Sequence, residues 1–281
     1  MKNPMYPDFA RKTFKWPGTV GALVQAGASS GKSHPGIGDC VLLNFESGLF
    51  ALSDSSDRDP GWSRKFLLRF DRMISSFPGI RLDREVNYLE IPGIAEKLDH
   101  ECRKILEAMR GPASCTLTSI LLLKTDTGMN ALIFHTGDSC LYEYDIFSRE
   151  LSTLVMPNFW MVGKTVKLFQ ITEFKIKPQV LFILSTDGVP TLSNDPAKKR
   201  SVAQIIQDSR VEEIPDRIMD MGIPAGSGFR DDAALIALST VKVKPAKKRI
   251  VIGGVRNRQE AEYIQRLATH DPSPGRGGRR S

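Results

Sequence analysis

Short apolar runs separated by turn residues dominate this sequence, and they constrain its fold more than any other feature. The runs are rich in Val, Ile, Leu and Phe and are bounded by Gly, Pro, Asp or Ser, as β-strands are. They cover residues 20–26, 40–45, 49–52, 116–123, 130–135, 140–144, 166–174, 180–185 and 233–238. Asp126-Thr127-Gly128 and Gly137-Asp138 each separate two runs, which is typical of hairpin turns. The chain is therefore expected to form antiparallel sheets.

Other segments have the periodicity of helices. Over residues 64–77 and 94–110, apolar residues recur at the spacing of one helix face. Shorter helices are expected over residues 201–208 and 212–221. Because runs of strands and runs of helices are segregated along the chain, this order favours an α+β domain with helices packed on antiparallel sheets.

Positive charge is concentrated near the C-terminal end. The formal net charge is +7, and residues 242–281 alone hold eleven Lys or Arg against three Asp or Glu. The remainder is close to neutral, so charge does not favour a nucleic-acid-binding protein. A strand over 249–252 and a helix over 259–269 are expected here, and the Pro-, Gly- and Arg-rich residues 271–281 are expected to be disordered. The basic tail is either a solvated segment or a contact for an acidic partner.

Cysteine spacing and hydropathy indicate a reduced, cytoplasmic protein. Cys40, Cys102, Cys115 and Cys140 are scattered and form no CxxC pair. The N-terminal residues contain no apolar segment of signal-peptide length, and the longest apolar runs are too short to cross a bilayer. No membrane contact is therefore expected.

One glycine-rich segment is similar to a phosphate-binding P-loop. Residues 27–33 read GASSGKS and follow a predicted strand. A P-loop needs four residues between its glycines and opens directly into a helix, but here three residues separate Gly27 from Gly31. The next residues, HPGIG, are a poor helix start. A loop is the favoured interpretation.

Aspartates stand at the ends of several predicted strands, where a buried sheet meets solvent. They are Asp39, Asp54, Asp138, Asp187, Asp231 and Asp232. Each of them alone is ordinary turn chemistry. As a set they predict a site for a hard cation such as Mg²⁺ or Mn²⁺, because such cations prefer carboxylate oxygens.

Five segments around these aspartates follow one another in a fixed order. They read GDCVLLNFESGLFALSDSSD, SCTLTSILLL, IFHTGDSCLYEYD, LFILSTDGVPTL and RDDAALIAL. In this order they resemble the motifs of the metal-dependent, type 2C family of serine/threonine phosphatases. The resemblance implies a four-layer sandwich of two antiparallel β-sheets flanked by helices. It assigns residues 19–240 to the phosphatase-like domain, 1–18 to an N-terminal extension, 241–270 to a basic extension and 271–281 to the tail.

The resemblance also implies a site for two cations, Mg²⁺ or Mn²⁺, at one end of the sandwich. Asp54 would bridge the two cations, and the backbone carbonyl of Ser55 would be a further ligand. Asp187 and Asp231 would complete the shell of one cation. Asp138, together with Asp187, matches the family's optional third metal site.

The same resemblance assigns roles in the reaction. Asp39 would hold a water of the metal site, which attacks phosphorus without any protein nucleophile. The sequence departs from the family pattern in three places. Gly38 stands where an acid normally precedes Asp39, and His34 stands where the family has its phosphate-binding arginine. Lys32 or Arg58 would then replace the charge of that arginine. The family's Asp-Gly-x-Gly-Gly block reads Asp54-Ser55-Ser56-Asp57-Arg58 here and has none of its glycines.

Three functions follow from these observations. The first is metal-dependent hydrolysis of phosphoserine and phosphothreonine in proteins. The second is a catalytically weak or inactive phosphatase-like domain that serves as a phosphoprotein-binding or regulatory module. Gly38 and His34 favour this second function. The third is an unrelated binding protein whose basic tail contacts nucleic acid or acidic partners. The aspartates Asp54, Asp187 and Asp231 favour the first.

Overall fold

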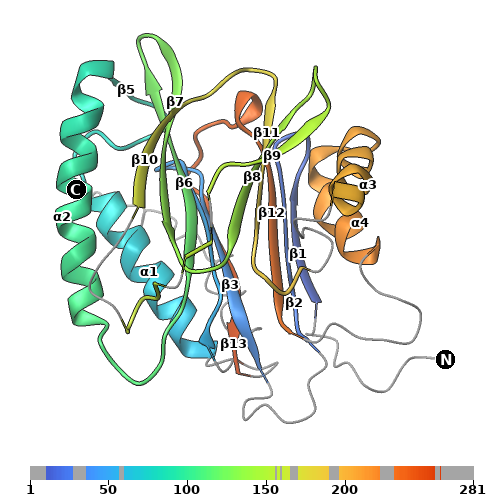
Figure 1. The fold of residues 1–281 in the computed structure, drawn as a ribbon. Coiled ribbons are helices and arrows are strands. Elements are labelled where there is room, and N and C mark those ends of the chain that lie inside the picture. The colour runs from blue at the N-terminus through green and yellow to red at the C-terminus, as the bar shows by residue number, and fades with distance from the viewer. Residues whose placement is uncertain are drawn as a thin grey trace, which may run out of the picture.

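A computed structural model of the chain describes residues 11–27, 36–56, 60–155, 157–158, 160–164, 170–189, 196–221, 231–256 and 260. Two β-sheets stack face to face, and helices cover both outer faces (Figure 1). This arrangement is the expected α+β, four-layer sandwich, and the predicted fold class is therefore confirmed.

The first sheet has six strands. They are β1 (Arg11–Trp16), β2 (Val20–Gln25), β8 (Cys140–Asp145), β9 (Glu150–Thr153), β11 (Val180–Ser185) and β12 (Ala233–Ser239). Their order across the sheet is β1-β2-β12-β11-β8-β9, and every neighbouring pair is antiparallel. The neighbours β11 and β12 are thus brought together from distant parts of the chain.

The second sheet has seven strands. They are β3 (Ile37–Asn44), β4 (Leu49–Ser53), β5 (Glu85–Val86), β6 (Leu117–Thr125), β7 (Gly128–Thr136), β10 (Gln170–Lys175) and β13 (Arg249–Val255). The order is β10-β7-β6-β4-β3-β13, with antiparallel neighbours throughout. The two-residue strand β5 pairs with the end of β6 in parallel.

Two pairs of helices form the outer layers. Helices α1 (Pro60–Ser76) and α2 (Ile91–Ala108) cover the seven-stranded sheet, whereas α3 (Pro196–Gln207) and α4 (Ile214–Met221) cover the six-stranded sheet (Figure 1). Short 3₁₀ helices lie at Tyr88–Glu90, Val211–Glu213 and Thr240–Lys242. Within the described part of the chain, no helix is long and apolar enough to span a bilayer.

Apolar side chains fill the spaces between the layers. Val41, Phe50 and Phe182 lie between the two sheets and are fully buried. Under α1, Phe66 and Phe70 pack on the outer face of the second sheet with other buried apolar residues, because helical residues four positions apart lie on the same face. Together these cores fix the strand ends, where the polar residues of the site lie.

Strands β1 and β9 lie outside the strands expected from the sequence. The resemblance assigns residues 1–18 to an N-terminal extension, but β1 pairs along its whole length with β2. Strand β13 contains the strand expected over 249–252 in the basic extension, and it pairs with β3. Strand β9 was not expected from the sequence, since ELST is short and polar. The expected helix over 259–269 and the tail 271–281 lie outside the described residues, except for Glu260. The domain division as a whole stays a prediction.

Candidate metal centre

Strand register brings aspartates from distant segments to one end of the sandwich. Cys40 of β3 pairs with Ser53 of β4, so the next residues across this ladder are Asp39 and Asp54. In the other sheet, Cys140 of β8 pairs with Ser185 of β11. Asp138 and Asp187 therefore lie just beyond the paired ends of β8 and β11.

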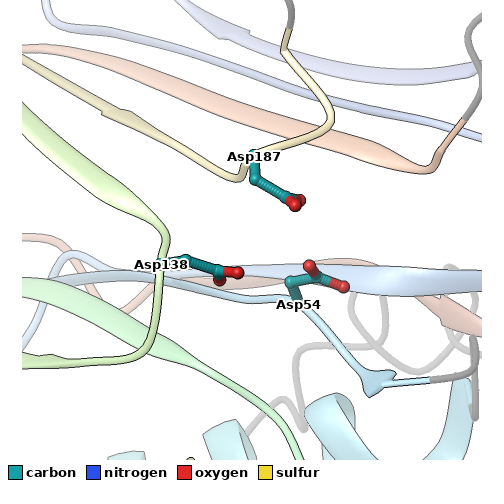
Figure 2. A group of neighbouring side chains, drawn as sticks. All are labelled: Asp54, Asp138 and Asp187. Carbon is teal, nitrogen blue, oxygen red and sulfur yellow. The ribbon is translucent and has the colours of Figure 1, made fainter. Parts of the chain in front are cut away.

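Three of these aspartates form a tight group. Asp54, Asp138 and Asp187 each offer a carboxylate oxygen, and these oxygens lie within 4.8 Å of one another. Figure 2 shows the three side chains pointing toward a common space, from the end of β4, the β7–β8 turn and the end of β11. Asp54 is half-buried and the other two are exposed, so the group is open to solvent.

Asp39 lies beside this group and is fully buried. Its Oδ2 accepts a hydrogen bond of 2.7 Å from Thr186 Oγ1. No described group donates a hydrogen bond to its Oδ1. The Asp54 carboxyl group neighbours the Asp39 carboxyl group, and one can donate to the other only when one of the two holds a proton. A buried carboxylate oxygen with no donor is a natural partner for a cation or a water.

Burial and mutual repulsion raise the pKa values of the cluster. Burial, followed by the Asp232 carboxylate, raises the pKa of Asp39 from 3.8 to about 8. Burial and then the Asp39 carboxylate raise the pKa of Asp54 well above its ordinary value. The pKa of Asp187 is also raised, by burial and then by Asp138. Positive charge is therefore needed to keep all of these groups ionised at neutral pH.

Asp231 lies near the tight group but is not part of it. Its charge raises the pKa values of Asp54 and Asp187, which places it in the same cluster. Its Oδ1 accepts a hydrogen bond of 2.9 Å from the backbone N–H of Asp232. The tight group is therefore completed by Asp138 and not by Asp231. The role of Asp231 as a ligand stays a prediction.

The segments that follow Asp54 and precede Asp39 are joined by α1. Ser55 Oγ accepts a hydrogen bond of 3.0 Å from the Ser63 N–H. The hydroxyl of Ser63 donates to the backbone carbonyl of Gly38. Gly38 therefore contributes only main-chain groups here, and no carboxylate stands at this position.

The residues expected to bind the substrate phosphate lie outside the described residues. These residues are Lys32, His34 and Arg58. The segment with P-loop similarity falls in the same stretch, apart from Gly27. Apart from the two-residue strand β5, both sheets are antiparallel, whereas a P-loop belongs to parallel βαβ architecture.

A network of buried hydroxyl groups supports Asp54, and sequence reasoning did not identify it. Thr116 Oγ1 accepts a hydrogen bond of 3.0 Å from the Asp54 N–H and lies 2.7 Å from Ser139 Oγ. Ser53 Oγ donates to the Thr116 carbonyl at 2.6 Å. The available signal was the run of hydroxyl residues in SCTLTS within an apolar strand, because buried hydroxyls need partners.

Thr116→Val is expected to destabilise the protein by about 1–3 kcal/mol, because it leaves the buried Asp54 N–H and the Ser139 hydroxyl without their partner. Urea unfolding followed by circular dichroism measures this change. Thr172→Val, at an exposed position on the edge strand β10, is the matched control and should change stability by less than about 0.5 kcal/mol. Equal effects of the two substitutions would contradict the supporting role of Thr116.

The donor set fits divalent cations with a preference for oxygen. Carboxylates from Asp54, Asp138 and Asp187 converge, Asp39 offers a buried oxygen without a donor, and no soft ligand is part of the group. Mg²⁺ and Mn²⁺ take oxygen ligands of this kind. A cation here would also offset the repulsion that raises the pKa values of these carboxyl groups.

Comparison with known proteins gives similarity in structure but none in sequence. No family model matches the chain, and no curated protein sequence matches it. The catalytic domain of the Ser/Thr protein phosphatase PstP, in complex with two manganese ions, aligns with a TM-score of 0.58 and 17% identity over 83% of this chain and 97% of that one. The Mycobacterium smegmatis phosphatase MsPP aligns with a TM-score of 0.54 and 13% identity over 79% of this chain and 97% of that one. Pseudomonas aeruginosa PppA aligns with a TM-score of 0.53 and 13% identity over 82% of this chain and 97% of that one.

These neighbours define the class of fold. The alignment with this chain covers nearly the whole length of these PPM-type Ser/Thr phosphatase structures. The chain therefore has the fold of the metal-dependent, type 2C protein phosphatases, and the resemblance in its motifs is confirmed at the level of fold.

Proposed function

We propose that this protein is a Mg²⁺- or Mn²⁺-dependent phosphatase that hydrolyses phosphoserine and phosphothreonine in proteins. The observation that carries the proposal is the convergence of Asp54, Asp138 and Asp187 from three strand ends, beside buried Asp39, in this fold. The manganese complex of PstP, a structural neighbour, supports the choice of cation. A phosphorylated protein is then the substrate.

The site residues divide into cation ligands and residues that orient the reactants. Asp54, Asp187 and Asp231 hold one cation, and Asp54 with the Ser55 carbonyl holds a second. Asp138 and Asp187 form a third, optional site. When bound, the cations supply the charge that binds a phosphate and lowers the pKa of a water that attacks phosphorus.

The remaining residues orient the reactants. Asp39 Oδ1, which is buried and has no described donor, would accept a hydrogen bond from the water and so orient it. Lys32, His34 and Arg58 bind the phosphate of the substrate. The basic stretch from Lys242 onward is a contact for an acidic partner, and the protein acts in the cytoplasm.

The alternative is a weak or inactive phosphatase-like module that binds phosphoproteins. Gly38 favours it, because this position adds no carboxylate for the second cation. This alternative retains the cation site but not the reaction. It therefore differs from the main proposal in catalysis and not in metal binding.

Hydrolysis of p-nitrophenyl phosphate and of a phosphothreonine peptide tests the proposal. Protein stripped with EDTA is expected to be inactive, and added Mn²⁺ is expected to restore hydrolysis, since the carboxylates are negative and without a cation they repel the phosphate. Undiminished hydrolysis in excess EDTA would refute a metal-dependent reaction. If no hydrolysis occurs at any Mn²⁺ concentration but Mn²⁺ raises the melting temperature, the binding module is the correct function.

A further inference from the structure

Asp232 contacts three segments that carry carboxylates of the candidate metal centre. Its backbone N–H donates a hydrogen bond of 2.9 Å to Asp231 Oδ1. Its Oδ2 accepts a hydrogen bond of 2.6 Å from the N–H of Gly38, the residue before Asp39. Asp232 therefore links the start of β12 with the start of β3.

The third segment packs on the main chain of Asp232. A Cβ atom at Gly188 would lie 1.8 Å from the carbonyl oxygen of Asp232, so this approach allows only glycine. Gly188 directly follows Asp187. The close contact therefore sets how near the turn that carries Asp187 comes to the start of β12.

The side chain of Asp232 suits this place because a carboxylate only accepts hydrogen bonds. In addition to the Oδ2 bond from Gly38, its Oδ1 accepts a hydrogen bond of 2.8 Å from the main-chain N–H of Gly27. Asp232 is only 2% exposed. Asparagine has one acceptor oxygen and one amide donor, so at this position its NH₂ group would face a main-chain N–H. An isosteric amide thus breaks one of the two contacts and leaves a buried donor unpaired.

We propose that Asp232 is a positioning residue of the metal centre, which sets the relative placement of Asp39, Asp187 and Asp231. Metal–ligand distances tolerate changes of only about 0.2 Å, so a shift of one segment weakens the site. This inference rests on the proposed function only in that the centre binds a divalent cation. It assigns Asp232 no contact with the cation or the substrate.

Calorimetric titration of the full chain with Mn²⁺ tests the inference without an activity assay. Asp232→Asn is expected to weaken Mn²⁺ binding by about 10–100-fold, the usual effect of losing a residue that orients metal ligands. The control is Asp71→Asn. Asp71 is a fully buried carboxylate that accepts from Asn44 Nδ2 at 2.7 Å, at the other end of β3. This variant should lose stability but keep the Mn²⁺ affinity of the wild-type chain.

A second variant separates position from charge. Gly188→Ala keeps every charge and forces the segments of Asp187 and Asp232 apart, so it too should weaken Mn²⁺ binding. If both variants fold cooperatively and bind Mn²⁺ as tightly as the wild-type chain, the positioning role is wrong and the proposed function stands. An equal loss in Asp71→Asn would reduce the effect to general destabilisation and overturn the inference. Failure of the wild-type chain to bind Mn²⁺ would overturn the proposed function and the inference together.

Discussion

Asp187→Asn is expected to lower Mn²⁺-dependent hydrolysis of p-nitrophenyl phosphate by more than about 100-fold, because even residues that only orient metal ligands contribute about 10–100-fold. Asp187 belongs to the tight group with Asp54 and Asp138, and its carboxylate is a shared ligand in the proposed mechanism. The amide keeps the shape of the side chain but loses the negative charge that holds a cation. The substitution should therefore lower the rate of hydrolysis without unfolding the protein.

The matched control for this variant is Asp145→Asn. Asp145 ends β8 and its Oδ1 accepts the N–H groups of Phe147 and Ser148 in the β8–β9 turn. Asparagine can make the same turn, so this variant should retain wild-type activity. Thermal melting of both variants in EDTA shows whether the fold is intact. An Asp187→Asn enzyme of undiminished rate would refute the proposed metal site.

Apolar runs made most of the fold predictable from the sequence. Strand β11 (VLFILS) and strand β12 (AALIALS) are buried on both faces, so their continuous apolar sequences mark them clearly. Strand β1 (RKTFKW) was missed because it is an edge strand in which each side chain is only half-buried or exposed, so its sequence has no continuous apolar run. The pattern identifies strands by what they bury, and edge strands bury least.

The site was predictable only in part, for a related reason. Aspartates at strand ends could be found because the ends of neighbouring strands meet at one edge of a sheet. The role of Asp232 could not be found in this way, since it depends on main-chain N–H groups of Gly27 and Gly38 that converge only in the folded chain. Thr116 was missed similarly, because a hydroxyl in an apolar strand does not reveal its partner.

The raised pKa of Asp39 predicts a definite pH dependence of stability in EDTA. The folded-state pKa is about 8 against an ordinary value of 3.8, so folding takes up a proton between these values. The stability contributed by protonated Asp39 is fully present below about pH 4 and is lost as the pH rises through about 8. Uptake of one proton changes the free energy of unfolding by about 1.4 kcal/mol per pH unit, which corresponds to roughly 3–6 °C in melting temperature for a chain of this size.

Comparison with Asp39→Asn isolates this contribution from other titrating groups. The variant cannot ionise at this position, so its melting temperature in EDTA should fall less between pH 5.5 and pH 8 than that of the wild-type chain. Mn²⁺ should act in the opposite direction on the wild-type chain, because a cation competes with the proton for the cluster of Asp39, Asp54 and Asp187. Its stabilisation should be larger at pH 8 than at pH 5.5. Parallel melting curves for the two proteins across this range would show that Asp39 is not protonated in the folded, metal-free state.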